Sequence, residues 1–220
     1  MDRRFLLGCD LARSLDFTSF AVIEMDEDLD GPIYHLRGLD RIKGVDYPKI
    51  VELIAATIKR LDKEKNTIDG PHLCMDASGL GAPVRDYLIE ADIFTDQKEI
   101  FPVVFTGGEA ARYDTVSHNY NISKTLIVSN LLSLMQHRRF DYSPDLQALS
   151  LLEREISSFK YHLTPSGHTG FDAESGEHDD LICAIAIPLI VGEWKFKIET
   201  IRGLTFVAIP KRRPLTYHGL

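Results

Sequence analysis

Residues 176–187 read Gly-Glu-His-Asp-Asp-Leu-Ile-Cys-Ala-Ile-Ala-Ile, so two adjacent carboxylates open an otherwise apolar helix. An aspartate at a helix start ordinarily caps free backbone N–H groups and suits the positive end of the helix dipole. One aspartate is enough for that role. The second lies at the N-terminus of a helix that the pattern predicts to be buried, where an unpaired carboxylate is costly. Asp179 and Asp180 therefore need a basic side chain or a metal ion beside them.

The composition is that of an ordinary globular protein. The 220 residues suffice for one sizeable domain, and no apolar run approaches the ~20 residues needed to span a membrane. The first residues have too short an apolar part for a secretory signal. Three cysteines (Cys9, Cys74 and Cys183) lack metal-ligand spacing and lie in apolar segments, which indicates reduced core residues. We expect a soluble protein from a reducing compartment, the cytoplasm.

The formal net charge of -8 argues against broad, nonspecific adhesion to nucleic acid. It does not exclude nucleic acid, because acids gathered in a metal site make the average misleading. Basic residues gather near the C-terminus, where such a cluster is more often a solvated tail than a binding arm. These residues are Lys195, Lys197, Arg202, Lys211, Arg212 and Arg213. We assign residues 1–194 to one domain and residues 195–220 to a basic extension packed on it.

Hydrophobic patterning predicts an α/β fold. Five segments have the alternation or the short apolar run of a strand: residues 4–10, 17–25, 33–42, 72–76 and 100–105. The first three should form an antiparallel meander, because the links between them are short. The fourth is followed by a glycine-bearing turn and a helix, which is the order of elements in a parallel α/β unit.

Helical periodicity follows the meander. Ile50, Ile54, Ile58 and Leu61 form one apolar stripe after Tyr47. Further helices are expected over residues 83–91, 122–137 and 144–157, and from the Asp-Asp pair to about residue 192. A hairpin is expected over residues 159–171 around Pro165-Ser166-Gly167, and another over residues 196–209 about Gly203.

Carboxylates recur at the ends of buried elements. Asp10 and Asp76 end predicted strands, and the Asp-Asp pair starts a predicted helix. Ligand sites of open α/β sheets gather at the carboxyl ends of strands. If the two strands are parallel neighbours, Asp10 and Asp76 are one strand spacing apart, ~5 Å. Such carboxylates raise each other's pKa unless a divalent cation lies between them. An all-oxygen site suits Mg²⁺ or Mn²⁺, and two such ions ~3.5–4 Å apart can clamp the attacking and leaving oxygens of a phosphodiester.

Each acid also has an ordinary structural interpretation. Asp10 could cap the following turn, and Asp76 could form an Asx-turn. Asp179 and Asp180 could serve only as helix caps. Each of these interpretations is the better one singly, but together they require three unrelated coincidences in one fold. The joint interpretation as a metal site is therefore favoured.

Three segments, in this order, resemble the nuclease domain of tailed-phage large terminase subunits. They are Gly8-Cys9-Asp10-Leu11-Ala12 with Asp16-Phe17-Thr18-Ser19 behind it, Met75-Asp76-Ala77-Ser78-Gly79-Leu80-Gly81, and His178-Asp179-Asp180-Leu181-Ile182-Cys183-Ala184. Ser123-Lys124, Arg138-Arg139-Phe140 and Phe171-Asp172-Ala173 also look like that family, so the resemblance runs from about Arg4 to Gly192. It implies an RNase H-like fold. The central sheet would be mixed and five-stranded, three antiparallel strands then two parallel ones, with helices on both faces and an extra hairpin.

The resemblance also implies an activity and partners. The activity is endonucleolytic hydrolysis of double-stranded DNA with two Mg²⁺ or Mn²⁺ ions, as in cutting concatemeric viral DNA during genome packaging. Asp10, Asp76 and one of the pair Asp179/Asp180 would be catalytic metal ligands, and Asp16 an outer-shell acid that positions water. An ATPase motor domain, a small terminase subunit and a portal protein would be partners, in the host cytoplasm if a phage encodes the chain.

Within the Asp-Asp pair we favour Asp180 as the direct ligand, because Ala184 and Ile187 put its face inward at helical spacing. Asp179 would assist. His178 could shuttle protons or contact DNA, although a surface histidine beside acids is commoner. The candidates for DNA backbone contacts, each against the alternative of a solvated charge, are Lys124, Arg138, Arg139 and Lys160.

One departure from the family and three rival interpretations remain open. The chain lacks the Gly-x-x-x-x-Gly-Lys-Ser/Thr phosphate loop of the terminase motor, so it is expected to be an excised domain or a stand-alone relative. Junction resolvases of the RuvC type and transposases place acids on the same elements. Actin-like kinases and ATPases have a loop that residues 76–81 partly match. The third rival is a catalytically silent DNA-binding or assembly module.

Overall fold

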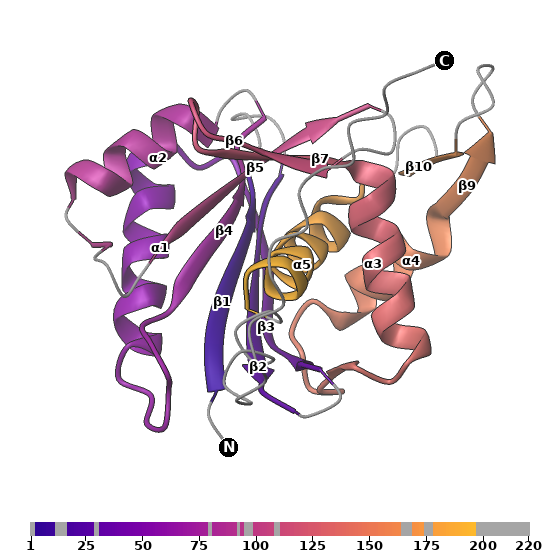
Figure 1. Cartoon of the computed structure of the whole chain (residues 1–220), viewed down its shortest axis with the longest axis horizontal. Coiled ribbons are helices and arrows are strands. Elements are labelled where there is room, and N and C mark those ends of the chain that lie inside the picture. The colour runs from indigo at the N-terminus through magenta and orange to yellow at the C-terminus, as the bar shows by residue number, and fades with distance from the viewer. Residues whose placement is uncertain are drawn as a thin grey trace, which may run out of the picture.

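The protein has three layers, a sheet between two layers of helices (Figure 1). They are seen in a computed structural model of the chain. The structure describes residues 3–11, 17–28, 31–78, 81–91, 93–94, 99–107, 111–163, 169–173 and 178–196. Within that part of the chain no helix is both long enough and apolar enough to cross a lipid bilayer.

The sheet contains the five predicted strands in the predicted arrangement. β1 (Arg3–Asp10), β2 (Phe17–Asp26) and β3 (Ile33–Lys43) form the antiparallel meander. β4 (His72–Asp76) pairs parallel with β1, and β5 (Ile100–Thr106) pairs parallel with β4. The central order is therefore β5-β4-β1-β2-β3. This order brings the carboxyl ends of β1 and β4 to the same edge of the sheet.

Three short strands that the sequence did not predict extend the sheet at both sides. They are β6 (Ala111–Asp114), β7 (Asn119–Ser123) and β8 (Phe140–Tyr142). β7 pairs with β5 and β6 with β7, while β8 pairs with β3, so the described sheet has eight strands. The added strands are three to five residues long and mostly polar, and such segments carry little of the hydrophobic alternation that marks a strand.

Helices cover both faces, as predicted. α1 (Tyr47–Leu61) and α2 (Gly81–Glu90) lie on one face, and α3 (Lys124–Gln136), α4 (Leu149–Ser158) and α5 (Asp180–Val191) on the other (Figure 1). α3 begins two residues later than predicted, because Ser123 ends β7 and its side chain accepts the N–H of Leu126 as an N-cap. α4 begins five residues later, after a turn at Pro144.

The segments around α5 complete the fold. The predicted first hairpin is formed by β9 (Phe159–Leu163) and β10 (Thr169–Ala173). α5 runs into a short π-helix, η1 (Gly192–Phe196). The second predicted hairpin and nearly all of the predicted extension, residues 197–220, lie outside the described residues.

α5 is buried along its whole length and lies directly on β1. Side chains of β1 alternate, with Leu6 in the core under α5 and Leu7 in the core under α1. Gly8 faces α5, and a Cβ added there would come within 1.9 Å of the Ala184 carbonyl oxygen. The absence of a side chain at Gly8 therefore lets helix and strand touch through their backbones. Cys9, Cys74 and Cys183 are buried and free, as predicted.

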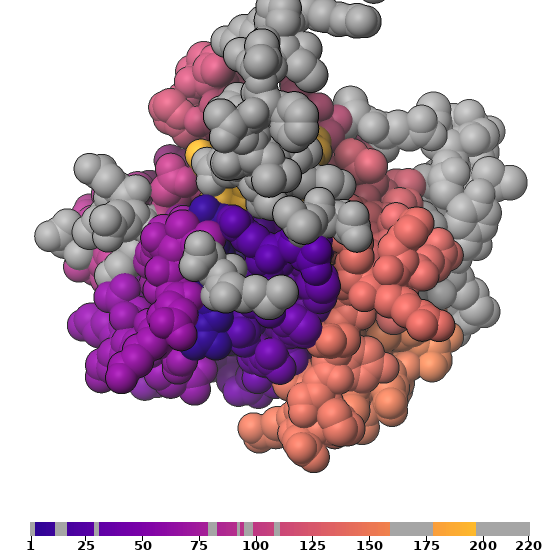
Figure 2. Space-filling model, turned by 60° about the horizontal axis from the view of Figure 1, so that its bottom comes forward, coloured from indigo at the N-terminus to yellow at the C-terminus, as the bar shows by residue number. Residues whose placement is uncertain are grey.

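The end of the sheet where β1 begins is closed by matched ion pairs. Figure 2 faces this end, with the strands lying between the helical layers of the two faces. Arg4, 4% exposed, donates to Asp69 (2.9 Å) and Glu27 (2.5 Å). Burial would raise the pKa of Asp69, but hydrogen bonds from His72 and Arg4 outweigh burial and lower it. The acids at this end are thus charged and paired.

The same balance holds for Glu24 on β2. Its carboxylate accepts from Arg3 (2.9 Å) and from Arg37 (2.7 Å). Burial would raise the pKa of Glu24, but these two hydrogen bonds outweigh it, and the pKa is lowered.

Candidate metal centre

A polar row crosses the opposite end of the sheet. Strand register places Asp10 opposite Ser19 and Ser19 opposite Arg41. Cys9 pairs with Met75 across β1 and β4, so the next residues, Asp10 and Asp76, come side by side. Strand alternation directs the row toward the α5 face. The Ser19 hydroxyl, fully buried, has no hydrogen-bond partner among the described residues.

The first residues of α5 reach the same place. Lys124 Nζ, at the start of α3, donates to Asp179 Oδ2 at 2.6 Å. Asp180 Oδ2 lies 3.5 Å from His178 Nδ1 and 4.0 Å from Arg41 Nη1. Two strand ends and two helix starts therefore lie at one end of the sheet.

The acids at this end of the sheet influence one another electrostatically. Burial raises the pKa of Asp10 well above its usual range, and the charges of Asp76, Asp180 and Asp179 raise it further, in that order. Lys124 opposes them. Burial also raises the pKa of Asp76, which is 8% exposed, even though Ser78 donates its N–H to Oδ1 at 2.7 Å. Burial and the neighbouring acids therefore both disfavour the charged form of Asp10, and Lys124 offsets them only in part.

The donor set fits Mg²⁺ or Mn²⁺, because it consists of carboxylate oxygens next to a buried hydroxyl that lacks a partner. Among the described residues, no three His, Cys, Asp or Glu side chains already surround one point as ligands. Asp179 is turned to Lys124 and Asp76 to Ser78, so holding an ion requires these carboxylates to rotate. Burial raises the pKa of the nearby Cys9 thiol, which makes it a poor ligand.

Two functional residues were not predicted, Glu155 on α4 and Arg41 on β3. Glu155 is 3% exposed and accepts the N–H groups of Leu181 (3.0 Å) and Ile182 (3.3 Å). Its other oxygen accepts from Arg41 at 2.9 Å. Burial raises the pKa of Glu155 to about 7. The sequence did carry a signal, since Glu155 follows Leu152 by three residues and shares the buried side of α4.

Glu155 also bears on the interpretation of the Asp-Asp pair as mere helix caps. Asp179 occupies the N-cap position of α5, yet its side chain makes no capping hydrogen bond. The N–H groups that such a cap would take are bound by Glu155 instead. For Asp179, the interpretation as a helix cap is wrong.

The remaining predicted site residues fall into two groups. Arg139 donates to the Pro32 carbonyl (2.9 Å) and to Glu193, just past the far end of α5, whose 12 residues span ~18 Å. Arg138 is exposed in the turn after α3 with φ 56°. The structure does not bring these two arginines to the acids. Asp16 and the side chain of Lys160 lie outside the described residues.

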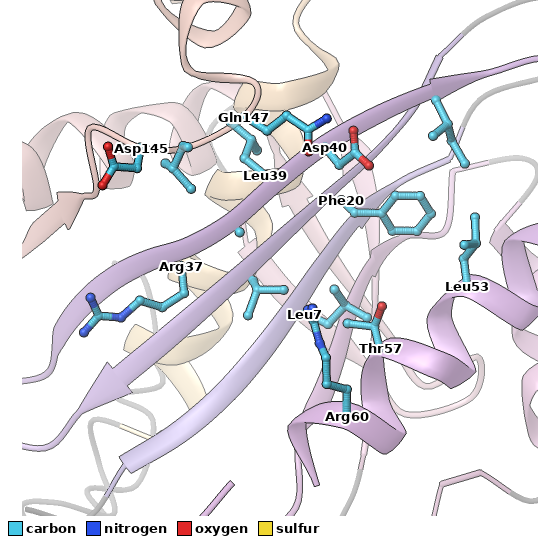
Figure 3. A pocket seen from close by; sticks show the side chains of 14 residues that line it. Leu7, Phe20, Arg37, Leu39, Asp40, Leu53, Thr57, Arg60, Asp145 and Gln147 are labelled. Atoms are coloured by element: carbon cyan, nitrogen blue, oxygen red, sulfur yellow. The ribbon is translucent and has the colours of Figure 1, made fainter. Parts of the chain in front are cut away.

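A groove of about 400 Å³ lies elsewhere, between α1 and the strands β2 and β3 (Figure 3). Its lining includes Arg37, Asp40, Arg60 and Asp145, and none of the predicted site residues. The carboxylate cluster lies instead at the end of the sheet where β1 and β4 finish. The groove is therefore separate from the acidic site.

Comparison with known proteins identifies the fold. No protein-family model and no curated protein matches the sequence. Among solved structures, the magnesium-bound large terminase nuclease of thermophilic phage G20c matches with a TM-score of 0.58 at 21% identity, covering 86% of this chain and 82% of that one. The large terminase nuclease domain of Thermus phage P74-26 matches at 0.57 and 19%, covering 88% and 82%.

A more distant match is the human cytomegalovirus terminase nuclease domain, manganese-soaked and inhibitor-bound. Its TM-score is 0.52 at 15% identity, covering 85% of this chain and 83% of that one. The protein thus has an RNase H-like α/β fold. More particularly, it has the fold of large terminase nuclease domains, which confirms the fold implied by the sequence resemblance.

Proposed function

We propose that this protein is a metal-dependent endonuclease that hydrolyses phosphodiester bonds of double-stranded DNA. The observation that carries the proposal is that Asp10, Asp76, Asp179 and Asp180 all stand where elements end or begin at one end of the sheet, with Lys124 beside them. Structures of the same fold support it, because the G20c nuclease is magnesium-bound and the cytomegalovirus domain manganese-soaked.

Asp10, Asp76 and Asp180 would hold the ions, with Asp179 assisting. Asp180 is favoured over Asp179 because its charge acts more strongly on Asp10 and because Asp179 is engaged by Lys124. When bound, divalent ions in a two-ion site supply a low-pKa water and stabilise charge on the attacking and leaving oxygens. Asp10, Asp76 and Asp180 belong to strands and a helix, so their backbones are held in place and only their carboxylate groups would have to rotate to bind an ion.

Other residues would handle the substrate. Of the predicted DNA contacts whose side chains the structure describes, Lys124 lies at the acids, and its ammonium group would donate to a phosphate oxygen. His178, whose side chain is 41% exposed, packs on Phe17 at the rim and is placed to accept or donate a proton at Nδ1. Asp16 remains in the proposal as an outer-shell acid.

The wider role follows from the shared fold. We extend the proposal to the cutting of concatemeric viral DNA during packaging, in the host cytoplasm. An ATPase motor domain, a small terminase subunit and a portal protein are the proposed partners. Residues 195–220 are proposed to form a basic extension of the nuclease domain.

Incubation with supercoiled plasmid DNA tests the proposal. Mn²⁺ or Mg²⁺ should support nicking and linearisation with little sequence preference, and EDTA should abolish both. Asp76→Asn should reduce cutting by more than about 100-fold, because even outer partners of metal ligands contribute about 10–100-fold. Asp26→Asn is the matched control, since Asp26 ends β2 at the opposite end of the sheet. Equal cutting by Asp76→Asn would contradict the proposal, and strong preference for a four-way junction would indicate a resolvase.

A further inference from the structure

The start of α5 is capped by a side chain from another helix. A helix begins with backbone N–H groups that have no partner within the helix, and an aspartate at the N-cap ordinarily accepts one of them. In α5 the groups of Leu181 and Ile182 donate to one oxygen of Glu155, which belongs to α4. Glu155 thus acts as a substitute cap in a region with almost no access to solvent.

This substitution determines where the Asp-Asp pair can point. A capping aspartate commits an oxygen to its own helix. Asp179 instead contacts Lys124, and its charge acts on Asp10 across the cluster. Asp180 lies beside His178 and Arg41. Because Glu155 occupies the two amides, Asp179 does not commit an oxygen to capping its own helix.

Arg41 connects this cap to the sheet. Its Nη1 is 2.9 Å from Glu155 Oε1 and 4.0 Å from Asp180 Oδ2, and its guanidinium lies 4.1 Å from the centre of the Phe17 ring. Arg41 belongs to the row that contains Asp10, one strand beyond Ser19. The guanidinium therefore links α4 and α5 to the strands that present the other carboxylates.

We propose that Glu155 and Arg41 are positioning residues, which hold the carboxylate of Asp180 in place relative to Asp10 for cation binding. The inference rests on the proposed nuclease function. Neither residue is assigned a contact with substrate. Glu155 acts through the first turn of α5, and Arg41 acts through its place between Glu155 and Asp180.

The other end of α5 supplies a matched control. Glu193, directly after α5, binds Arg139 and accepts from Tyr34 Oη at 3.1 Å. Its side chain is 12% exposed, so this is also a largely buried Glu–Arg pair that anchors α5. It differs from the Glu155–Arg41 pair in lying away from the carboxylate cluster. Loss of either pair should destabilise the fold, but only loss of the first should change the site.

The experiment compares Glu155→Ala and Glu155→Gln with Glu193→Ala and Glu193→Gln in the full chain. Mn²⁺ affinity is measured without DNA, and kcat and KM for duplex cutting are measured at saturating Mn²⁺. Glu155→Ala should weaken Mn²⁺ binding by about 10-fold or more and lower kcat more than it changes KM. Glu155→Gln keeps an oxygen for the two amides and should recover part of the loss. The Glu193 variants should stay within about twofold of wild type in Mn²⁺ affinity, since outer partners act locally.

Each outcome separates the two proposals. If the wild type binds Mn²⁺ and cuts DNA but the Glu155 and Glu193 variants behave alike, the positioning role is wrong and the nuclease function stands. If the wild type neither binds Mn²⁺ nor cuts, the nuclease function fails and the positioning role with it. Should Glu155→Ala not fold, the glutamine variants carry the same comparison.

Discussion

The two ends of β1 treat buried charge in opposite ways. At its start, Arg3 and Arg4 each pair with two acids, and hydrogen bonds from basic side chains lower the pKa values of Glu24 and Asp69. At its finish, Asp10 meets further acids, and burial with their charges raises its pKa. One strand of eight residues thus joins an end where acids pair with arginines, the matched end, to an end where an acid lies beside other acids, the mismatched end.

The difference agrees with the proposal that the first end serves stability and the second serves function. At the matched end the charged forms are favoured by folding. At the mismatched end folding brings acids together, which is unfavourable. Such an arrangement persists where the surrounding structure holds it in place and a function requires it. Charged groups are present at both ends of β1, so their presence alone does not distinguish the proposed site. What distinguishes it is that acids lie beside other acids.

The largest expected effect is at the matched end. Arg4→Met leaves Asp69 and Glu27 without their shared partner, and breaking a buried ion pair costs about 3–5 kcal/mol. Because both acids are partly exposed, we expect about 3 kcal/mol, measured by urea unfolding. Cutting by the folded fraction should be unchanged. Arg37→Met, with a side chain 49% exposed, is the control and should cost under about 1 kcal/mol. A loss of under about 1 kcal/mol for Arg4→Met would contradict the expected contrast between the two ends of β1.

The next effect has the opposite sign. Asp10→Asn removes an acid whose pKa is raised by burial and by neighbouring acids, so the metal-free protein should become more stable to unfolding by urea. The same variant should lose DNA cutting and the stabilisation that Mn²⁺ gives to the wild type. Asp69→Asn is the matched comparison and should lose stability while retaining cutting. A less stable Asp10→Asn protein in EDTA would show that the acidic end is not under repulsion.

The smallest effect is on pH dependence. Burial raises the pKa of Asp10, of Asp76 and, to about 7, of Glu155, so the folded state binds protons more readily than the unfolded state. The metal-free protein should therefore become more stable as pH falls from 8 to 6. Each kcal/mol gained in the free energy of unfolding should raise Tm by about 2–4 °C. Near pH 4 the trend should reverse as Glu24 and Asp69 lose their charges.

Thermal unfolding in EDTA measures this pH dependence. Glu155→Gln should flatten the rise in Tm between pH 8 and pH 6. Saturating Mn²⁺ should oppose the rise, because ligands must lose protons to bind metal. A metal-free Tm that falls steadily from pH 8 to pH 6 would contradict the prediction.

The sequence predicted the elements that dominate the core and the acids at their ends. The all-apolar run after Asp180 predicted α5, and strand-end aspartates predicted the convergence. The sequence did not predict the Glu155–Arg41 pair. The two residues are far apart in sequence and meet only through the register of β2 with β3 and the packing of α4 on α5. The roles of Arg139 and Lys124 were equally undecided, since sequence gives charge but not the partner. The structure places Arg139 on Glu193 and Lys124 among the acids.

The contact at Gly8 has a consequence for ion selection. The Ala184 carbonyl and the Pro188 ring lie against Gly8, so no side chain of β1 separates helix and strand there and the backbones themselves set their distance. Cations of different radius must then be accommodated by torsion of the carboxylate groups. In the proposed site, the backbone would set the distance between the residues that bear the ligands, and the aspartate rotamers would set the range of ion radii that fit.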